Sequence, residues 1–185
     1  MPESLAPGLL IATPRILDEN FDHTVIFMIE HGPVGALGVV INRPSDIKVS
    51  VLLERIGVAY RGELKAPVLL GGPVQRENIL VLHREGNEPG DSRAVGRSVF
   101  VGASQAALGR LFANPGAQAL CFAGYAGWGP GQLESELSRG DWIPAPMDEG
   151  LIFSANRESL WERVLRSIGI DPRVLVAGEG GGETN

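Results

Sequence analysis

Cysteine and long apolar runs are both scarce in this sequence, and each shortage excludes a class of protein. The single cysteine, Cys121, excludes an intramolecular disulfide and any zinc site built from cysteines. Its neighbours in Ala119–Ala123 are apolar, so we expect a buried thiol. The longest apolar runs have about five residues, against the ~20 that span a bilayer, and Met1–Leu5 lacks the basic residue of a signal peptide. We therefore expect a cytoplasmic protein with no membrane segment.

Positive charge is also in short supply. Asp and Glu number 22 against 16 for Lys and Arg, which sets the formal net charge at -6. The only lysines are Lys48 and Lys65, and acidic residues are interleaved with the arginines between Arg76 and Arg110. A protein that neutralises the phosphates of a nucleic acid needs a basic face, and no such stripe is visible. Direct nucleic-acid binding is therefore disfavoured and is kept as the weakest alternative.

The motifs of several enzyme classes are missing. Neither lysine precedes a Ser or Thr, as a phosphate-binding loop requires, and the spacing of Gly127, Gly129 and Gly131 misses the dinucleotide fingerprint. The sequence has no G-x-S-x-G nucleophile elbow, no H-E-x-x-H motif and no pair of histidines at helical spacing. It thus predicts no catalytic residue, no metal site and no cofactor, and it leans against an enzyme.

Glycine, by contrast, is abundant and spread along the chain. It accounts for 25 of 185 residues, about twice its average usage of ~7%, which indicates many tight turns rather than a linker. The length suits one domain or a compact pair of subdomains. We predict a single domain over residues 1–177 and a Gly/Glu tail over 178–185, which has nothing to bury and should be disordered.

The hydrophobic pattern changes between strand and helix periods without a regular repeat. Strands are expected at Leu9–Ala12, Thr24–Ile29, Leu37–Ile41, Val68–Leu70, Ile79–His83, Ser98–Val101, Ala117–Phe122, Trp142–Ile143 and Leu151–Phe153. Helices are expected around Val49–Ile56 (capped by Ser45 or Asp46), Ala107–Phe112 (capped by Ser104), Leu133–Leu137 (beginning at Pro130), Leu160–Ile168, and after Asp171. This mixture predicts an α/β protein of the α+β type, with a mixed sheet and helices packed around it.

Thr24–Ile29 and Leu37–Ile41 are close enough in sequence to form an antiparallel hairpin across a short Gly/Pro loop. If His31 faces Ala36, the polar residues gather at opposite ends of the strands, roughly 20 Å apart. One end carries Glu30 and His31, and the other carries Asp22, His23, Thr24, Asn42 and Arg43.

Each end of this hairpin has two interpretations. The planar guanidinium of Arg43 suits a carboxylate or a phosphate, but it could equally close the sheet end through Asp22. Glu30 and His31 could serve as an acid–base pair, or they could be ordinary polar neighbours of an exposed loop.

The stretch from Gly124 to Glu134 is the most distinctive, because a buried strand runs into a glycine-rich turn and then into a helix start. Bare amides at a helix N-terminus favour anions, and the rings of Tyr125 and Trp128 could form an apolar wall with polar handles. The alternative is structural: the glycines permit close packing and Trp128 fills the core. A second tight turn, Gly71–Val74, could approach the first.

Together these strings resemble the AlgH/YqgE family of bacterial proteins. The strings that carry the resemblance, over about residues 8–170, are Thr24-Val25, Glu30-His31, residues 35–44, Gly71-Gly72-Pro73-Val74, Val81-Leu82-His83, Gly124–Trp128 and Gly131–Glu134. The resemblance implies an α/β fold with a bifurcated, largely antiparallel sheet curled into a pseudo-barrel and flanked by helices. Some members carry the label of transcriptional regulator, but no helix-turn-helix pattern supports it, so we expect any effect on transcription to be indirect.

We therefore hypothesise a cytoplasmic regulatory or adaptor protein that acts through a partner protein or a small anionic ligand. One alternative is a ligand-binding protein or enzyme with its site near the Gly124–Gly131 turn, and the other is direct nucleic-acid binding. The candidate ligand or partner residues are Thr24, Glu30, His31, Asn42, Arg43, Gly71, Gly72, Pro73, Tyr125, Gly127, Trp128, Gln132 and Glu134.

Overall fold

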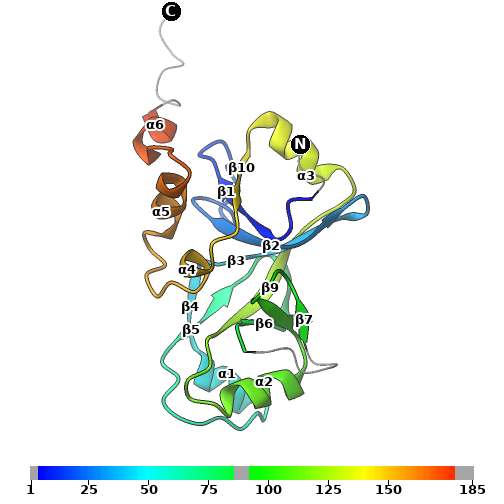
Figure 1. Ribbon diagram of the computed structural model, residues 1–185, viewed down its shortest axis with the longest axis vertical. Coiled ribbons are helices and arrows are strands. Elements are labelled where there is room, and N and C mark those ends of the chain that lie inside the picture. The colour runs from blue at the N-terminus through cyan, green and yellow to red at the C-terminus, as the bar shows by residue number, and fades with distance from the viewer. Residues whose placement is uncertain (1–3, 86–91, 178–185) are drawn as a thin grey trace, which may run out of the picture. The chain divides into compact units, whose positions relative to one another are not determined.

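The computed structural model of the chain describes residues 4–85 and 92–177 (Figure 1). Its backbone contacts divide the chain into two compact units, one made of Met1–Asn42 with Gly127–Asn185 and the other of Arg43–Ala126. The tail at 178–185, for which the sequence predicts disorder, lies outside the described residues.

The first unit is built on an antiparallel sheet in the order β10-β1-β2-β3. The strands are β1 (Gly8–Ala12), β2 (Val25–Gly32), β3 (Gly35–Val40) and β10 (Trp142–Pro146). β1 and the first five residues of β2 are buried throughout, which agrees with the apolar side chains that the sequence places on both faces.

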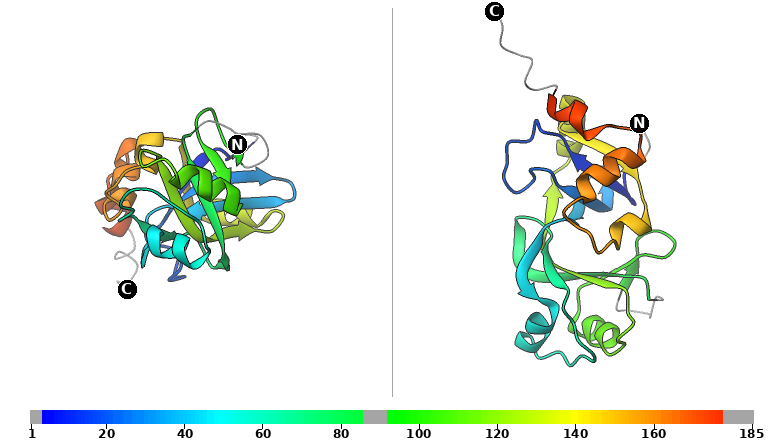
Figure 2. Two further views of the ribbon diagram at one scale, coloured as in Figure 1. Left: turned by 90° about the horizontal axis from the view of Figure 1, so that it is seen from below. Right: turned by 90° about the vertical axis from the view of Figure 1, so that its left-hand side faces the viewer.

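The helices of this unit are α3 (Gln132–Arg139), α4 (Glu149–Ile152), α5 (Leu160–Ser167) and α6 (Pro172–Ala177). Helices α3 and α5 pack on the sheet, and α4 and α6 pack on α5. α5 packs on β1 and β2 (Figure 2). It buries Leu160, Trp161, Val164 and Leu165 of the expected stripe, and Ile168 is partly buried. Gly169, two residues after the end of α5, has a φ of 80° and closes the helix in the left-handed conformation.

The β2–β3 hairpin is confirmed, and His31 lies opposite Ala36 as expected. Ile29 is an extra residue between the Met28–Gly38 and Glu30–Leu37 pairs, so Ile26 faces Val40 instead of Ile41. This bulge shifts the pairing by one residue but keeps the polar groups at opposite ends of the hairpin.

The second unit contains the remaining strands in the order β4-β5-β9-β6-β8-β7, all antiparallel except for the β5–β9 pair. They are β4 (Pro44–Lys48), β5 (Pro67–Leu70), β6 (Val74–His83), β7 (Ser92–Ala94), β8 (Phe100–Gly102) and β9 (Ala119–Trp128), whose last two residues belong to the first unit. Helices α1 (Val49–Arg55) and α2 (Gln105–Phe112) share an apolar core with Cys121, which is buried as expected.

Glycines allow the backbones of β5, β6 and β9 to approach closely in the second unit. The Gly71 amide donates to the Ala123 carbonyl over 2.9 Å. A Cβ on Gly72 would collide with the backbone of Tyr125, and one on Gly124 would lie 2.7 Å from the Gly72 oxygen. The Gly71–Val74 turn, which was expected to approach the glycine-rich turn, thus lies against Gly124 and Tyr125 of strand β9.

Several local expectations were wrong. Leu151–Phe153 is not a strand, because the Asp148 carboxylate accepts from the Leu151 amide and starts α4 there. Neither Ser45 nor Asp46 caps α1: both lie in β4, which the sequence did not predict, and the Ser45 hydroxyl donates to Val68 of β5.

The stretch before α3 also differs from its prediction. β9 continues through Gly124 to Trp128, so the turn is confined to residues 129–131. The helix begins at Gln132 instead of Pro130, because Gly131 has a φ of 73° and serves as its N-cap.

The expected fold class, a mixed α/β protein with a largely antiparallel sheet and flanking helices, is confirmed. Among residues 4–85 and 92–177, no helix combines the length and the apolar character that a membrane crossing requires.

Candidate ligand-binding site

A hollow of about 460 Å³ opens in the first unit, where the end of β9, helix α3, the start of β10 and the loop after β1 meet. Its lining combines aromatic rings with charged side chains. The lining residues are Arg15, Ile16, Leu17, Asp18, Phe21, Gly127, Trp128, Gln132, Glu136, Arg139, Asp141 and Trp142.

The two ends of α3 determine which side chains reach this hollow. The Gly129 amide donates to the Gln132 side chain over 3.0 Å, which ties the glycine-rich turn to the first helical residue. At the other end Gly140 has a φ of 79°, and the Asp141 amide donates back to the Glu136 carbonyl. The chain therefore reverses after α3 and brings Trp142 beside the helix that it has just left.

The carboxylate of Glu136 joins the parts of the site. Its Oε2 accepts the indole N–H groups of Trp128, at 2.8 Å, and Trp142, at 2.7 Å. Its Oε1 accepts from the Gln132 amide group over 2.9 Å. One carboxylate thus fixes both indole rings and satisfies two donors that would otherwise be buried without a partner.

The aromatic rings stack edge to face. The centroids of Trp128 and Trp142 lie 5.9 Å apart with an interplanar angle of 79°, and those of Phe21 and Trp142 lie 5.6 Å apart at 78°. This is the geometry that aromatic quadrupoles favour. The rings form a rigid apolar wall, because hydrogen bonds to Glu136 orient the two indoles.

Charged groups surround this wall. The Arg139 guanidinium pairs with Asp141 over 2.7 Å and also donates to Ser135. Arg15 is exposed, and within the described residues its guanidinium has no carboxylate partner. The hollow is lined by two arginines and three acids, and beside its aromatic rings the Arg15 guanidinium is a cationic donor without a carboxylate partner in the described part of the chain.

The loop that carries Arg15 and Phe21 is anchored to the end of α3. The Thr13 amide donates to the Asp141 carbonyl over 2.9 Å, and the buried Thr13 hydroxyl donates to the Gly140 carbonyl over 2.8 Å. These bonds satisfy carbonyls beyond the helix end and hold the loop over Trp142.

The acids of the hollow are all engaged as acceptors. Glu136 accepts from three side-chain groups, Asp141 accepts from Arg139, and Asp18 accepts from the backbone and side chain of Asn20. Residues 4–85 and 92–177 contain no group of His, Cys, Asp and Glu arranged to hold a metal ion. The carboxylates orient neighbouring side chains, among them the two indoles. The arrangement is therefore suited to binding a planar group against those rings.

Sequence reasoning found part of this site and missed the rest. Gly127, Trp128 and Gln132 line the hollow. The missed lining residues that carry its chemistry are Arg15, Phe21, Glu136, Arg139, Asp141 and Trp142. Glu136 had a usable signal, because it lies one helical turn after Gln132 on a predicted helix; Arg15 and Phe21 had none.

The Glu30–His31 end of the hairpin forms a separate cluster. The Leu5 amide donates to His31 Nδ1 over 3.2 Å, so Nε2 carries the proton and donates to Glu134 over 3.1 Å. Glu30 is exposed in β2 opposite Leu37. His31 and Glu134 thus connect the N-terminal segment, the hairpin and α3, away from the aromatic wall.

The other end of the hairpin is closed by side chains that bond to the backbone. The Asn42 side chain accepts from the Val25 amide and donates to the His23 carbonyl, both over 2.9 Å. The buried Thr24 hydroxyl donates to the Phe21 carbonyl. His23 pairs with Asp22 over 2.6 Å. Asn42 and Thr24 therefore satisfy the backbone where β2 begins.

The remaining candidates belong to the second unit. The Arg43 carbonyl accepts from the Leu70 amide. Gly71 and Gly72 pack against the backbone of β9, Pro73 lies exposed between them and β6, and Tyr125 pairs with Val74. The candidates of the sequence are thus distributed over several places in the two units.

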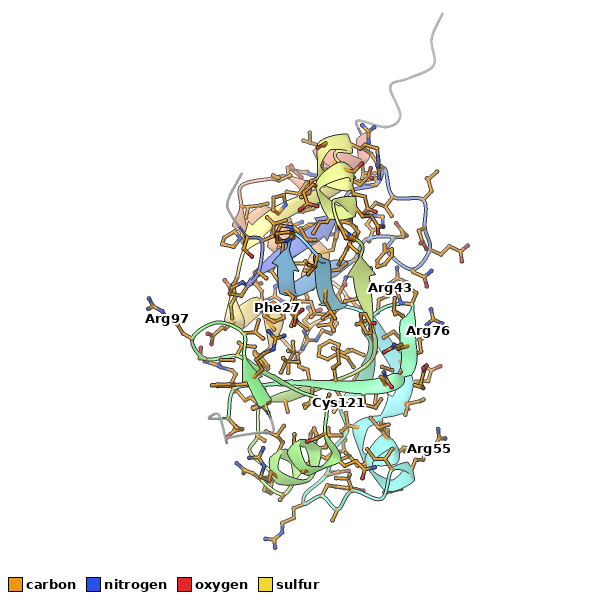
Figure 3. The ribbon with its side chains drawn as sticks, turned by 90° about the vertical axis from the view of Figure 1, so that its right-hand side faces the viewer. Phe27, Arg43, Arg55, Arg76, Arg97 and Cys121 are labelled. Atoms are coloured by element: carbon orange, nitrogen blue, oxygen red, sulfur yellow. The ribbon has the colours of Figure 1, made fainter. Side chains whose placement is uncertain are left out.

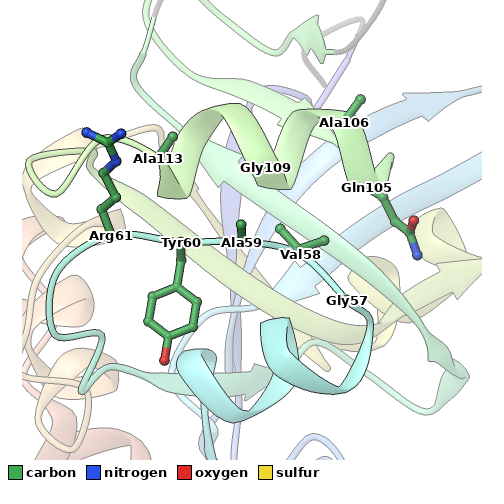
Figure 4. A pocket seen from close by; sticks show the side chains of 9 residues that line it. All are labelled: Gly57, Val58, Ala59, Tyr60, Arg61, Gln105, Ala106, Gly109 and Ala113. Atoms are coloured by element: carbon green, nitrogen blue, oxygen red, sulfur yellow. The ribbon is translucent and has the colours of Figure 1, made fainter.

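The second unit has a hollow of its own, of about 560 Å³, where the segment Gly57–Arg61 runs along α2 (Figure 4). Glycine and alanine make up much of its lining, which includes Val58 and Gly109. Its Tyr60 hydroxyl donates to Glu54 over 2.7 Å, and this bond raises the pKa of Tyr60. We favour the first hollow as the candidate site, because aromatic rings and a guanidinium without a carboxylate partner among the described residues converge there.

Comparison with known proteins is consistent over nearly the whole chain. A family model described as AlgH-like matches residues 9–173. A UPF0301 protein of Anaeromyxobacter dehalogenans strain 2CP-C is 40% identical over 192 residues, which cover 98% of this chain and 97% of the relative. A UPF0301 protein of Myxococcus xanthus is 38% identical over 180 residues, with 96% and 98% covered.

Solved structures show the same fold. The solution structure of the AlgH protein from Pseudomonas aeruginosa matches with a TM-score of 0.78 and 32% identity, and the match covers 100% of this chain and 97% of that one. A crystal structure of a Corynebacterium diphtheriae protein matches with a TM-score of 0.73 and 24% identity over 92% and 91% of the two chains.

Proposed function

The chain belongs to the AlgH-like family, and from that premise we propose that it is a cytoplasmic, non-catalytic regulatory protein that binds a small anionic ligand in the hollow beside Trp128 and Trp142. The observation that carries this proposal is the aromatic wall beside the Arg15 guanidinium, which has no carboxylate partner within the described residues. The same proposal includes the regulatory role, which the protein would exert by acting on a partner protein.

The chemistry of the hollow selects the ligand class. Ligand sites are typically apolar and aromatic, with a few polar groups that fix orientation. Two edge-to-face indoles and Phe21 favour a flat ring, while Arg15 favours a carboxylate or phosphate on that ring. We therefore propose a planar molecule of modest size that carries one negative group.

Binding is favoured over catalysis by the state of the carboxylates. A general base must reach the proton that it abstracts with a free lone pair. Both oxygens of Glu136 already accept hydrogen bonds, and Asp141 neutralises Arg139. The side chains of the hollow thus hold a shape, which is what a sensor of ligand concentration needs.

The proposal is tested with indole-3-acetate and its neutral analogue indole-3-acetamide, monitored by the indole N–H signals in NMR spectra. We expect the acetate to shift the signals of Trp128 and Trp142 but not that of Trp161, whose N–H donates to the Ala12 carbonyl outside the hollow. The amide should bind more weakly. Arg15→Ala should weaken acetate binding about 2- to 5-fold, the effect of one exposed charge pair.

The matched control is Arg55→Ala, because Arg55 is an exposed arginine of the second unit that points away from the ribbon (Figure 3). It should bind the acetate as the unaltered chain does. Equal binding of acetate and amide would remove the anion preference. Turnover of ester, phosphate or peptide substrates that a change in the hollow abolishes would contradict the non-catalytic role.

A further inference from the structure

Two arginines of the first unit, Arg157 and Arg163, lie without a carboxylate beside the segment that connects α4 to α5. Three other arginines of this unit, Arg139, Arg166 and Arg173, each form an ion pair with an acid. Within residues 4–85 and 92–177, the guanidinium groups of Arg157 and Arg163 bond only to uncharged oxygens.

Backbone carbonyls hold Arg157 in place. Its Nη1 donates to the Ile152 carbonyl over 2.6 Å and to the Ile41 carbonyl over 3.2 Å, which are the ends of α4 and of the hairpin. Carbonyls at a helix C-terminus attract a cation. The side chain is mostly buried, and the desolvation, together with the nearby charge of Arg163, lowers the pKa of Arg157 to about 10.

Arg163 approaches the same segment from the first turns of α5. Its Nη1 donates to the Ser154 hydroxyl over 2.7 Å and to the Asn156 carbonyl over 3.3 Å. The other nitrogens of both guanidinium groups have no partner among the described residues. Since every buried side-chain nitrogen of those residues is hydrogen-bonded, these free nitrogens reach solvent.

We propose that Arg157 and Arg163 form a binding site for a tetrahedral oxyanion, a phosphate or a sulfate group. Each guanidinium has donors left over in a planar fork that matches the spacing of two anion oxygens. An anion between them would compensate two like charges, one of which is largely desolvated. The site shares no residue with the aromatic hollow.

The test measures thermal unfolding of the full chain against sodium phosphate at constant ionic strength, with sodium chloride as the balancing salt. Phosphate that binds the native state should raise Tm in proportion to the logarithm of its concentration. Arg163→Gln should weaken phosphate binding at least about 10-fold, because it removes a charge-assisted donor. Arg166→Gln is the matched control: it lies on the same helix and pairs with Glu162, so it should retain the response.

Equal responses of the unaltered chain and Arg163→Gln would overturn the proposal. So would an equal response to chloride, because simple screening would then relieve the repulsion. If Arg163→Gln does not fold, the Nε–H signals of Arg157 and Arg163 in the unaltered chain decide: phosphate must shift both, and unchanged signals refute the site. This test uses phosphate and Arg163→Gln, whereas the test of the hollow uses indole-3-acetate and Arg15→Ala. Failure of one proposal therefore leaves the other unaffected.

Discussion

At the residue scale, Glu136 is the group on which the candidate site depends. Its two oxygens receive two indole N–H groups and one amide group, so its removal would leave buried donors unsatisfied. The sequence shows only a glutamate in a helix. Its role follows from the reversal of the chain at Gly140, which brings Trp142 within reach.

We expect Glu136→Gln to destabilise the protein by about 1–3 kcal/mol, the range for hydrogen bonds to a charged acceptor. The amide retains one oxygen for the indoles but turns an N–H₂ group toward the N–H₂ group of Gln132. Urea unfolding followed by tryptophan fluorescence measures the change. Glu162→Gln is the control, since it breaks only an exposed pair with Arg166, and should cost less than about 1 kcal/mol. Equal losses would contradict the assigned role.

His83 is a second residue with a measurable consequence. It is buried, stacks on Phe100, donates from Nδ1 to the Glu85 carbonyl over 2.9 Å and accepts at Nε2 from the Ser92 hydroxyl over 2.8 Å. Burial, the largest cause, lowers the pKa of His83 below its usual value of 6.5. The native state therefore favours neutral His83 more strongly than the unfolded chain does.

This difference predicts a pH dependence of a definite sign. The unfolded state binds more protons, so the contribution of His83 to stability is present above about pH 6.5 and declines as the pH falls below it. His83→Gln should lack this component, so the two chains should differ more in unfolding free energy at pH 7.5 than at pH 5.5. Urea unfolding at several pH values measures it, with His23→Gln, an exposed histidine, as the control. A difference independent of pH would refute it.

At the scale of elements, glycines decide where strands can meet. Gly124 and Gly131 have the same φ of 73°, but they differ in their surroundings. A Cβ on Gly124 would lie 2.7 Å from the Gly72 oxygen and 2.8 Å from the Val74 oxygen, whereas one on Gly131 would meet nothing within 4 Å. Alanine substitutions at these two positions therefore distinguish the cost of backbone strain alone from the cost of strain together with a steric clash.

We expect Gly131→Ala to cost about 1–2 kcal/mol, the price of a left-handed conformation for a residue with a Cβ. Gly124→Ala should cost clearly more, because the same strain is joined by a collision with two carbonyls of the neighbouring backbone. Urea unfolding of the two variants measures the difference. Similar costs would mean that β5 and β6 yield to the methyl group, and that Gly124 serves conformation alone.

The boundaries of elements were predictable where the signal was local. Ser104 caps α2 as expected, because its hydroxyl accepts from the Ala107 amide within the same few residues. α1 shows the opposite case, since the Ser45 hydroxyl bonds to Val68 in a strand that is distant in sequence. A local sequence pattern cannot show whether a serine hydroxyl will cap the next helix or bond to a strand that only the tertiary fold brings near.

At the scale of the whole molecule, the distribution of the candidate residues shows the limit of sequence reasoning. Trp128 and Gln132 were found because an unusual string carries them, and they line the hollow. Thr24 and Asn42 satisfy backbone groups at the end of β2. A polar residue at a strand end looks the same in the sequence whether it binds a ligand or satisfies backbone groups. Only its hydrogen-bond partners in the structure distinguish the two roles.

The sequence by itself determined the mixed α/β class, the β2–β3 hairpin and the amphipathic stripe of α5, because periodicity and turn residues act over a few neighbouring positions. It also determined the family, through strings in a fixed order. Only the tertiary structure decided the aromatic hollow and the Arg157–Arg163 pair. The hollow is lined by separate segments that strand register, helix ends and loop anchoring bring together. The two arginines are near neighbours in the sequence, but their lack of a carboxylate partner within the described residues and the contact of Arg157 with Ile41 are properties of the folded chain.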